Sequence, residues 1–280
     1  MSTVESKDGT RIAYSRTGNG PPVIVVDGAA CYRKFGPSTR LATLLAGHLT
    51  VVTYDRRGRG RSGDTQPYAA EREIEDLQAL IGEVGGSAYL YGVSSGAALA
   101  LETAARSADV KKLVLYEAPF TEDASRAAAA GEYSAQLSRL LAAGRRGDAV
   151  ALFLRRAGLP GALITLMRIL PVWPKLTAIA PTLAYDDAVL SITQPGQPLP
   201  AGRWATVTIP TLCLAGGNSP AWLHDGMQAL AQALPNAQFQ ALEGQTHVVK
   251  PKVHAPLLEE FFTSGDRAQD VHYGAGQQVA

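Results

Sequence analysis

The sequence has only two cysteines, Cys31 and Cys213, and they stand far apart. They form no Cys-x-x-Cys pair and no cysteine/histidine spacing of the kind that holds zinc, so neither a disulfide framework nor a zinc site is predicted. We expect both to be buried thiols. We also expect neither a metal ion nor any other cofactor.

Charge of one sign is not in excess either, because 26 lysines and arginines against 25 aspartates and glutamates give a net charge of +1. This balance provides no basic face for nucleic acid and no acidic tail. Charge is concentrated locally at Arg56, Arg57, Arg59 and Arg61, which alternate with glycines in a predicted loop. We interpret this cluster as a solvated, structural turn rather than a phosphate site.

Long apolar runs are missing as well. The longest apolar region, Leu159 to Trp173, is broken by Pro160, Arg168 and Pro171, which argues against a membrane span. The first residues, Met1 to Glu5, lack the charged and then apolar pattern of a cleaved secretion signal. We therefore expect a cytoplasmic protein that binds neither membranes nor nucleic acid.

What the chain does have is a 46% hydrophobic content over 280 residues, enough for one large α/β domain or two ordinary ones. Strand-like runs alternate with helical ones, which predicts a mainly parallel sheet flanked by helices. A turn at Lys7 to Thr10 predicts an initial hairpin. The predicted strands are Val23 to Val26, Thr50 to Tyr54, Ala88 to Tyr91, Lys112 to Tyr116, Thr211 to Leu214 and Gln238 to Leu242.

Two amphipathic helices are predicted among these strands. One runs through Ile74 and Val84 and stops at Gly85-Gly86, and the other runs from Val253 to Phe262. The alternation breaks at 121–205, which is rich in alanine, leucine and arginine and is predicted to be a helical lid inserted into a core domain of 1–120 and 206–265. We expect the tail, 266–280, to be flexible.

A helical insertion of this kind lies over the carboxyl ends of the strands, where the loops carry chemistry. Large apolar side chains of the lid are therefore candidates to line a substrate pocket, and the alternative is that they pack the lid on itself. The candidates are Met167, Leu170, Trp173, Tyr185 and Trp204, with Asp27 and Cys31 on the core side.

The most informative motif is Gly92-Val93-Ser94-Ser95-Gly96, between a strand-like run and an alanine-rich helical run. A serine on so tight a turn needs glycines on either side, because side chains there would collide with the neighbouring strand and helix. The turn exposes the Ser94 hydroxyl. It also places the N–H of Ser95 at a helix N-terminus, where it can meet a developing oxyanion.

A serine hydroxyl is a weak nucleophile until a base removes its proton, so Ser94 needs a histidine within reach. His247 has the right setting, because it follows the last strand-like run and precedes the last helix. The other four histidines lie in a helix, before a strand, at a helix start or in the tail.

In these residues the chain resembles the α/β-hydrolase superfamily over nearly its whole length. The resemblance rests on the turn at Gly92 to Gly96, the stretch Tyr54 to Ser62 and the late His247. It implies the α/β-hydrolase fold and the chain order nucleophile, acid, histidine. In the family the acid usually ends the strand after the lid.

At that position this sequence has Asn218 and Ser219, and an amide in the acid's place costs about 10⁴ in kcat in the serine protease case. Glu117 is the best replacement, since it ends the strand after the nucleophile's helix, where haloalkane dehalogenases in this superfamily carry their acid. The alternative is that Glu117 pairs with a lid arginine. Asp225 is a weaker candidate, one turn into a helix.

The oxyanion loop departs from the family's usual His-Gly, because the chain has Asp27-Gly28-Ala29-Ala30. The N–H groups of Ala29 and Ser95 are the expected donors. Two like charges at 4 Å cost about 4 kcal/mol at an effective dielectric of 20, so Asp27 beside an oxyanion needs an explanation. Asp27 must turn away, pair with a cation such as Arg33 or Arg61, be protonated, or serve a chemistry without a strong oxyanion.

Three functions are compatible with these residues. The leading one is a serine hydrolase that opens an ester, lactone or thioester of a medium-sized apolar small molecule through an acyl-enzyme on Ser94, with His247 as base and Glu117 as its orienter. The second is a non-hydrolytic cyclase, lyase or cofactor-free oxygenase with His247 acting on the substrate. The third is a ligand-binding protein without catalysis.

Overall fold

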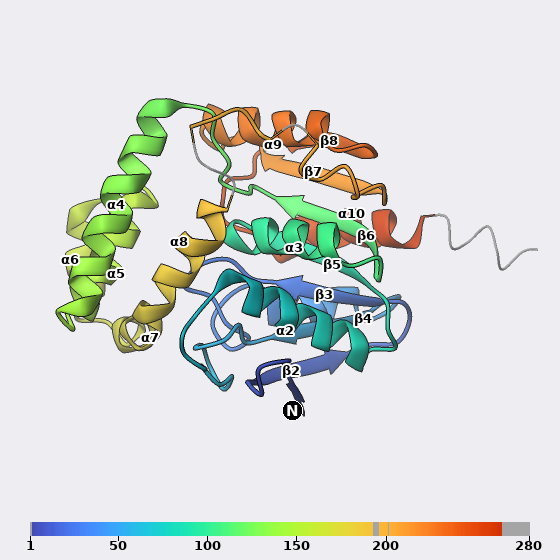
Figure 1. The fold of residues 1–280 in the computed structure, drawn as a ribbon, viewed down its shortest axis with the longest axis horizontal. Helices are drawn as coiled ribbons and strands as arrows, with labels where there is room; N and C mark the ends of the chain where they lie inside the picture. The colour runs from blue at the N-terminus through green and yellow to red at the C-terminus, as the bar shows by residue number, and fades with distance from the viewer. Residues whose placement is uncertain (1, 193–195, 201, 265–280) are drawn as a thin grey trace, which may run out of the picture.

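The computed structural model describes residues 2–192, 196–200 and 202–264, which form an eight-stranded sheet with helices on both faces (Figure 1). The predicted flexible tail, 266–280, lies outside the described residues. The strands are β1 Ser2–Glu5, β2 Arg11–Thr17, β3 Pro22–Val26, β4 Thr50–Tyr54, β5 Ala88–Val93, β6 Val110–Tyr116, β7 Thr211–Gly216 and β8 Ala237–Leu242.

The sheet has the strand order β1-β2-β4-β3-β5-β6-β7-β8. The hairpin β1–β2 and the β2–β4 pair are antiparallel, and every other neighbouring pair is parallel. The predicted hairpin and the strands predicted from apolar runs are confirmed. The sheet is mainly parallel because a helical crossover returns the chain to the same end of the sheet, so that the two strands it joins run in the same direction.

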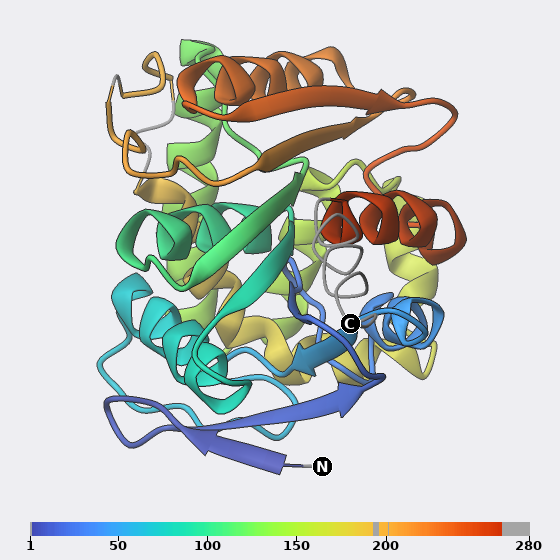
Figure 2. The same ribbon diagram turned by 90° about the vertical axis from the view of Figure 1, so that its right-hand side faces the viewer.

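Helices α2, α3 and α9 cover one face of the sheet, and α1 and α10 cover the other (Figures 1 and 2). Both predicted amphipathic helices are confirmed, as α2 and α10. The helices are α1 Ser38–Leu45, α2 Ala70–Glu83, α3 Ser95–Arg106, α4 Ala124–Ala142, α5 Arg146–Arg156, α6 Gly161–Met167, α7 Val172–Ile179, α8 Leu183–Ser191, α9 Ala221–Ala233 and α10 Pro251–Thr263.

Each face of the sheet has its own apolar core, because successive side chains of a strand point to opposite faces. In β3, Ile24 and Val26 join the core under α2, α3 and α9, whereas Val23 and Val25 join the core under α1 and α10. A strand buried on both faces is a continuous apolar run rather than an alternating one. This is why the central strands were recognisable in the sequence.

Helices α4 to α8 are inserted between β6 and β7 and lie beyond the ends to which the parallel strands point (Figure 1). They pack around an apolar cluster of their own, which includes Leu137, Val150 and Leu176. The last of them, α8, rests on α3 and α2. We call α4 to α8 the inserted helices.

The arginine turn after β4 is not solvated, and that part of its interpretation was wrong. Arg56, Arg57 and Arg59 are all buried, whereas Arg61 is exposed. Arg57 donates to Asp76 in α2 at 2.6 and 2.8 Å. A buried guanidinium is tolerated only with carboxylates or carbonyls to bind, and this turn finds them in α2 and in the inserted helices.

Among the residues that the structure describes, no single helix is both long enough and apolar enough to cross a bilayer. The pair Gly161–Met167 and Val172–Ser191 meets the length and composition criteria jointly, with a bend of 99° between its two members.

A buried histidine makes the stability of this fold depend on pH. His254 in α10 is fully buried against Tyr91 and Tyr116, with the Tyr91 hydroxyl 2.9 Å from Nδ1. Burial lowers the pKa of His254 to about 4. The unfolded chain therefore binds a proton between pH 6.5 and 4 that the folded chain excludes, so stability falls as pH falls through that window.

We expect the free energy of unfolding to drop by about 3 kcal/mol from this group between pH 7 and pH 4. His254→Phe should flatten that part of the pH profile in urea titrations, whatever its effect at pH 7. The matched control is His48→Gln, at an exposed histidine that faces Glu259. An unchanged slope in His254→Phe would contradict the assignment.

Candidate active site

Ser94 lies between β5 and α3 in a backbone conformation that non-glycine residues rarely adopt, with φ 56° and ψ −125°. A Cβ on Gly96 would approach the Val26 carbonyl oxygen to 2.2 Å, and one on Gly92 would approach the Ala97 Cα to 2.6 Å. Both glycines are therefore required by packing. Strain of this kind costs about 1–3 kcal/mol and persists where the surrounding structure enforces it.

Glu117 follows β6 directly and is fully buried, also with a positive φ of 48°. Its Oε2 accepts a hydrogen bond from His247 Nδ1 at 2.6 Å, and its Oε1 accepts one from the Gly216 N–H at 2.6 Å. Burial raises the pKa of Glu117, but its contacts with His247, with Ser219 and with the Gly216 N–H outweigh burial, so that the pKa lies below its ordinary value. An ionised carboxylate thus fixes the imidazole tautomer with Nε2 unprotonated.

His247 belongs to the loop between β8 and α10, and its side chain is 46% exposed. Among the described residues no hydrogen bond joins its ring to Ser94. Gly28, in the loop after β3, is the close neighbour of Ser94, because a Cβ added there would lie 3.0 Å from Ser94 Cβ. The structure therefore joins Glu117 to His247 and leaves the serine as a separate, half-buried hydroxyl.

The other acid candidates do not contact His247. Asn218 is exposed, and its backbone N–H donates to the Gln245 carbonyl at 2.8 Å. Asp225 is exposed and lies one turn into α9. The lid-arginine alternative for Glu117 is not what the structure shows, because both carboxylate oxygens of Glu117 are taken by His247 and Gly216.

The two predicted oxyanion donors flank this site. Ser95 opens α3 directly after Ser94, and Ala29 follows Gly28 in the loop after β3. Neither of their N–H groups has a hydrogen-bond partner among the residues the structure describes. Two free N–H groups beside a hydroxyl are what a developing oxyanion needs.

Asp27 is buried and accepts a hydrogen bond from the Ser38 hydroxyl. It does not pair with Arg33, which binds Asp55 at 2.9 Å, or with Arg61, which is exposed. Burial raises the pKa of Asp27 to about 6, against lowering by the Ser38 hydrogen bond and by Arg59 and Arg56. Of the four explanations for Asp27, the structure favours the protonated one at mildly acidic pH.

The raised pKa of Asp27 makes the free energy of unfolding depend on pH. Its contribution to stability is fully present below pH 3.8 and is lost as pH rises through 6, because the folded chain ionises it less readily than the unfolded chain. We expect Asp27→Asn to gain up to about 3 kcal/mol relative to the wild type at pH 8 and almost nothing at pH 4. Chemical unfolding at both pH values measures this, with Asp225→Asn as the exposed control. Equal effects at the two pH values would refute it.

Several predicted pocket residues are packing residues instead. Trp204 is 1% exposed, stacks on Phe120 and donates from Nε1 to Glu102 at 3.0 Å. Tyr185 stacks on Tyr68 with ring centroids 3.7 Å apart, and its hydroxyl binds the loop after the arginine turn. The alternative of internal packing describes both, because each has found neighbours for its ring and a partner for its polar atom.

Three of the remaining pocket candidates belong to the insertion itself, in α6, in α7 or between them. Met167 and Trp173 are half-buried against their apolar cluster, and Leu170 is exposed. Cys213 is buried as predicted, but Cys31 is only half-buried. Burial of the thiol still raises the pKa of Cys31 to about 12, so it is not a thiolate nucleophile.

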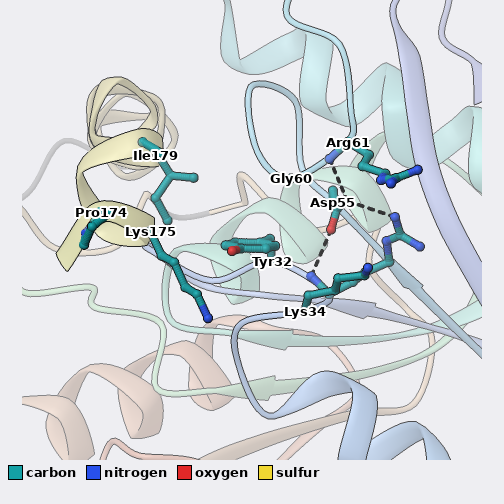
Figure 3. A pocket seen from close by; sticks show the side chains of 10 residues that line it. Tyr32, Lys34, Asp55, Gly60, Arg61, Pro174, Lys175 and Ile179 are labelled. Carbon is teal, nitrogen blue, oxygen red and sulfur yellow. Dashed lines mark hydrogen bonds and ion pairs between the residues drawn. The ribbon is translucent and has the colours of Figure 1, made fainter. Parts of the chain in front are cut away.

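A cavity of about 420 Å³ opens between α7 and the loops after β3 and β4. Tyr32 lies across it from Pro174, Lys175 and Ile179, and Asp55 closes the opposite end (Figure 3). Its lining includes neither the Ser94 turn nor the Glu117–His247 pair. Over the described ranges, no three histidine, cysteine or carboxylate side chains gather to hold a metal.

The alpha/beta hydrolase family model matches residues 18–259 of the chain. The chain belongs to the alpha/beta hydrolase family. An alpha/beta hydrolase from Sphaerobacter thermophilus has 47% sequence identity to it and a TM-score of 0.83, over 94% of this chain and 100% of that one.

Two further proteins resemble this α/β hydrolase less closely. The uncharacterized hydrolase YraK of Bacillus subtilis is 34% identical over 105 residues, 35% of this chain and 37% of that one, so the match spans little more than a third of the relative. An enol-lactonase from Burkholderia xenovorans shares the fold with a TM-score of 0.65, at 20% identity over 94% of this chain and 100% of that one.

Sequence analysis missed Asp186, a buried carboxylate of α8. It accepts hydrogen bonds at 2.6 Å from Arg56, Arg59 and the Ser95 hydroxyl. The helical insertion has no motif that marks this residue. The available signal was indirect, because arginines turned inward require carboxylate partners from elsewhere in the chain.

Proposed function

We propose that this α/β hydrolase cleaves a carboxylic ester, lactone or thioester through an acyl-enzyme on Ser94. The observation that carries the proposal is the 2.6 Å hydrogen bond from His247 to a buried Glu117, at the sheet edge where Ser94 is held in a strained turn. Nucleophile, orienter and base then come in the order Ser94, Glu117, His247 along the chain.

In the first half of the reaction, the Ser94 proton passes to Nε2 of His247 as Oγ attacks the carbonyl carbon of the substrate. The carbonyl oxygen becomes an oxyanion that accepts hydrogen bonds from the N–H groups of Ala29 and Ser95. Collapse breaks the bond to the leaving oxygen or sulfur, which takes the proton from the imidazolium. Water repeats the sequence on the acyl-enzyme and regenerates Ser94.

The proposal requires His247 to come within hydrogen-bond distance of Ser94 when substrate is bound. Catalytic hydrogen bonds are often long without substrate and tighten in the reacting complex. His247 is exposed and lies in a loop, whereas its carboxylate partner is fixed by the backbone of Gly216. A small rotation of this loop is the expected adjustment.

The inserted helices would act as a lid and favour a medium-sized apolar substrate. They lie beyond the carboxyl ends of the strands that precede Ser94 and Glu117 (Figure 1). Their half-buried side chains include Met167 and Trp173. We accordingly propose a small apolar molecule as the partner, and not a nucleic acid.

A panel of p-nitrophenyl esters, lactones and acyl thioesters tests the proposal, together with labelling by a fluorophosphonate. We expect turnover on at least one class and a single labelled residue, Ser94, by peptide mass spectrometry. His247→Ala should lose labelling, whereas His224→Ala, a change at the α9 histidine 2.7 Å from the Gly216 carbonyl oxygen, should keep it. Absence of both turnover and labelling would refute the proposal.

A non-hydrolytic reaction is the second candidate, and the specific observation in its favour is Asp27. A buried carboxyl beside Gly28 disfavours an oxyanion whenever it is ionised. In such a reaction His247 would take a proton from the substrate directly. The ester panel would then give little turnover, and Ser94→Ala would remain active on the true substrate.

A further inference from the structure

Asp186, a buried side chain of the inserted helices, is linked to both proposed oxyanion donors, directly to Ser95 and through Arg59 to the loop that contains Ala29. Asp186 in α8 accepts hydrogen bonds at Oδ1 from the Ser95 hydroxyl and from Arg56 Nη1, each at 2.6 Å. At Oδ2 it accepts one from Arg59 Nη2, also at 2.6 Å. The Ser95 residue that it holds supplies one of the two free N–H groups beside Ser94.

The same two arginines hold the loop that supplies the other N–H group. Arg59 Nη1 donates to the carbonyl oxygens of Gly28 at 2.8 Å and Cys31 at 3.3 Å, which bracket Ala29 in the chain. Arg56 Nη1 also lies 3.3 Å from the carbonyl oxygen of Asp27. Every one of these contacts is buried or nearly so, and therefore little screened by water.

We propose that Asp186 is a positioning residue for the oxyanion site, fixing the N–H groups of Ala29 and Ser95 relative to each other from the inserted helices. The inference rests on the proposed function, because it assigns those groups to the oxyanion. The physical reason is that donors stabilise a transition state only when held within about 0.5 Å of the productive geometry. One carboxylate that binds both supports removes their independent motion.

The charge of Asp186 is part of this role. Burial raises the pKa of Asp186, but the charges of Arg59 and Arg56 lower it by more, so that the pKa falls below its ordinary value. With Glu73, which binds Arg56 at 2.6 and 2.7 Å, the cluster has two carboxylates for two guanidinium groups. An amide at position 186 would leave one guanidinium charge uncompensated and free the loop after β3.

The ion pair of Arg57, the neighbouring arginine of the same turn, offers a matched control. Asp76 is buried and binds Arg57 through two hydrogen bonds. Among the described residues, the other hydrogen bonds of the Arg57 side chain go to Asp8 and to the Arg72 carbonyl. Asp76→Asn therefore removes a buried ion pair without touching either oxyanion support. Comparing it with Asp186→Asn separates positioning from stability.

The experiment measures ester hydrolysis and backbone hydrogen exchange in both variants. We expect Asp186→Asn to lower kcat by about 10- to 100-fold with KM changed less than threefold, and to speed exchange in 27–32 and 94–97. Asp76→Asn should leave kcat within threefold and both segments unchanged, although it destabilises the protein. Equal kcat losses in the two variants, or unchanged exchange in Asp186→Asn, would overturn the proposal.

If Asp186→Asn does not fold, Ser95→Ala removes one arm of the contact and leaves the ion pairs intact. It should lower kcat about 3- to 10-fold at constant KM and speed exchange in 94–97 only; an unchanged kcat would overturn the proposal. The exchange measurement needs no substrate. It therefore decides whether Asp186 fixes these segments even if the wild type proves inactive on every ester, which would refute the proposed function instead.

Discussion

Ser94→Ala should abolish ester turnover, with a loss in kcat on the order of 10⁶-fold, as in serine hydrolases that lose their nucleophile. The reason is that no acyl-enzyme can form, and only the binding groups and the two free N–H groups remain to assist water. Steady-state kinetics on the best ester of the panel measure the loss. Fluorophosphonate labelling should disappear together with turnover.

The matched control is Ser107→Ala, at the other end of α3, where the hydroxyl hydrogen-bonds with Asp109 at the surface. It should keep full turnover and labelling. Persistent labelling of Ser94→Ala would place the nucleophile elsewhere. Retained ester turnover without labelling would show that hydrolysis does not pass through an acyl-enzyme on Ser94.

Glu117→Gln should lower kcat by about 10⁴-fold, the loss known for an amide in place of the triad acid in a serine protease. The amide keeps the shape but can hold the imidazole in the wrong tautomer, and it no longer stabilises the imidazolium. Because the pKa of Glu117 lies below its ordinary value, the acid is ionised throughout the neutral range. The loss should therefore be the same at pH 6.5 and pH 8.5.

Asn218→Asp is the companion variant, since it restores a carboxylate where the family usually has one. Asn218 is exposed and contacts the histidine loop through its backbone only, so we expect a change of less than threefold in kcat. Full activity in Glu117→Gln, combined with a large gain in Asn218→Asp, would show that Glu117 is not the partner of His247.

The parts of this protein that its sequence determined are those with a local physical cause. Strands such as β3 are apolar throughout because both faces are buried, and the glycines around Ser94 are required by contacts within the turn itself. The pairing of Glu117 with His247 was predicted from strand ends, because parallel strands bring their carboxyl ends to one edge of the sheet.

Only the tertiary structure decided what depends on partners distant in the chain. The arginine turn was expected in solvent, yet Arg56 and Arg59 are buried because Asp186, some 130 residues away, binds both of them and Glu73 binds Arg56 as well. Trp204 packs into the core rather than lining a pocket, because its ring stacks on Phe120 and its Nε1 donates a hydrogen bond to Glu102. Burial of a polar group depends on whether a partner meets it in space, and local sequence patterns do not contain that information.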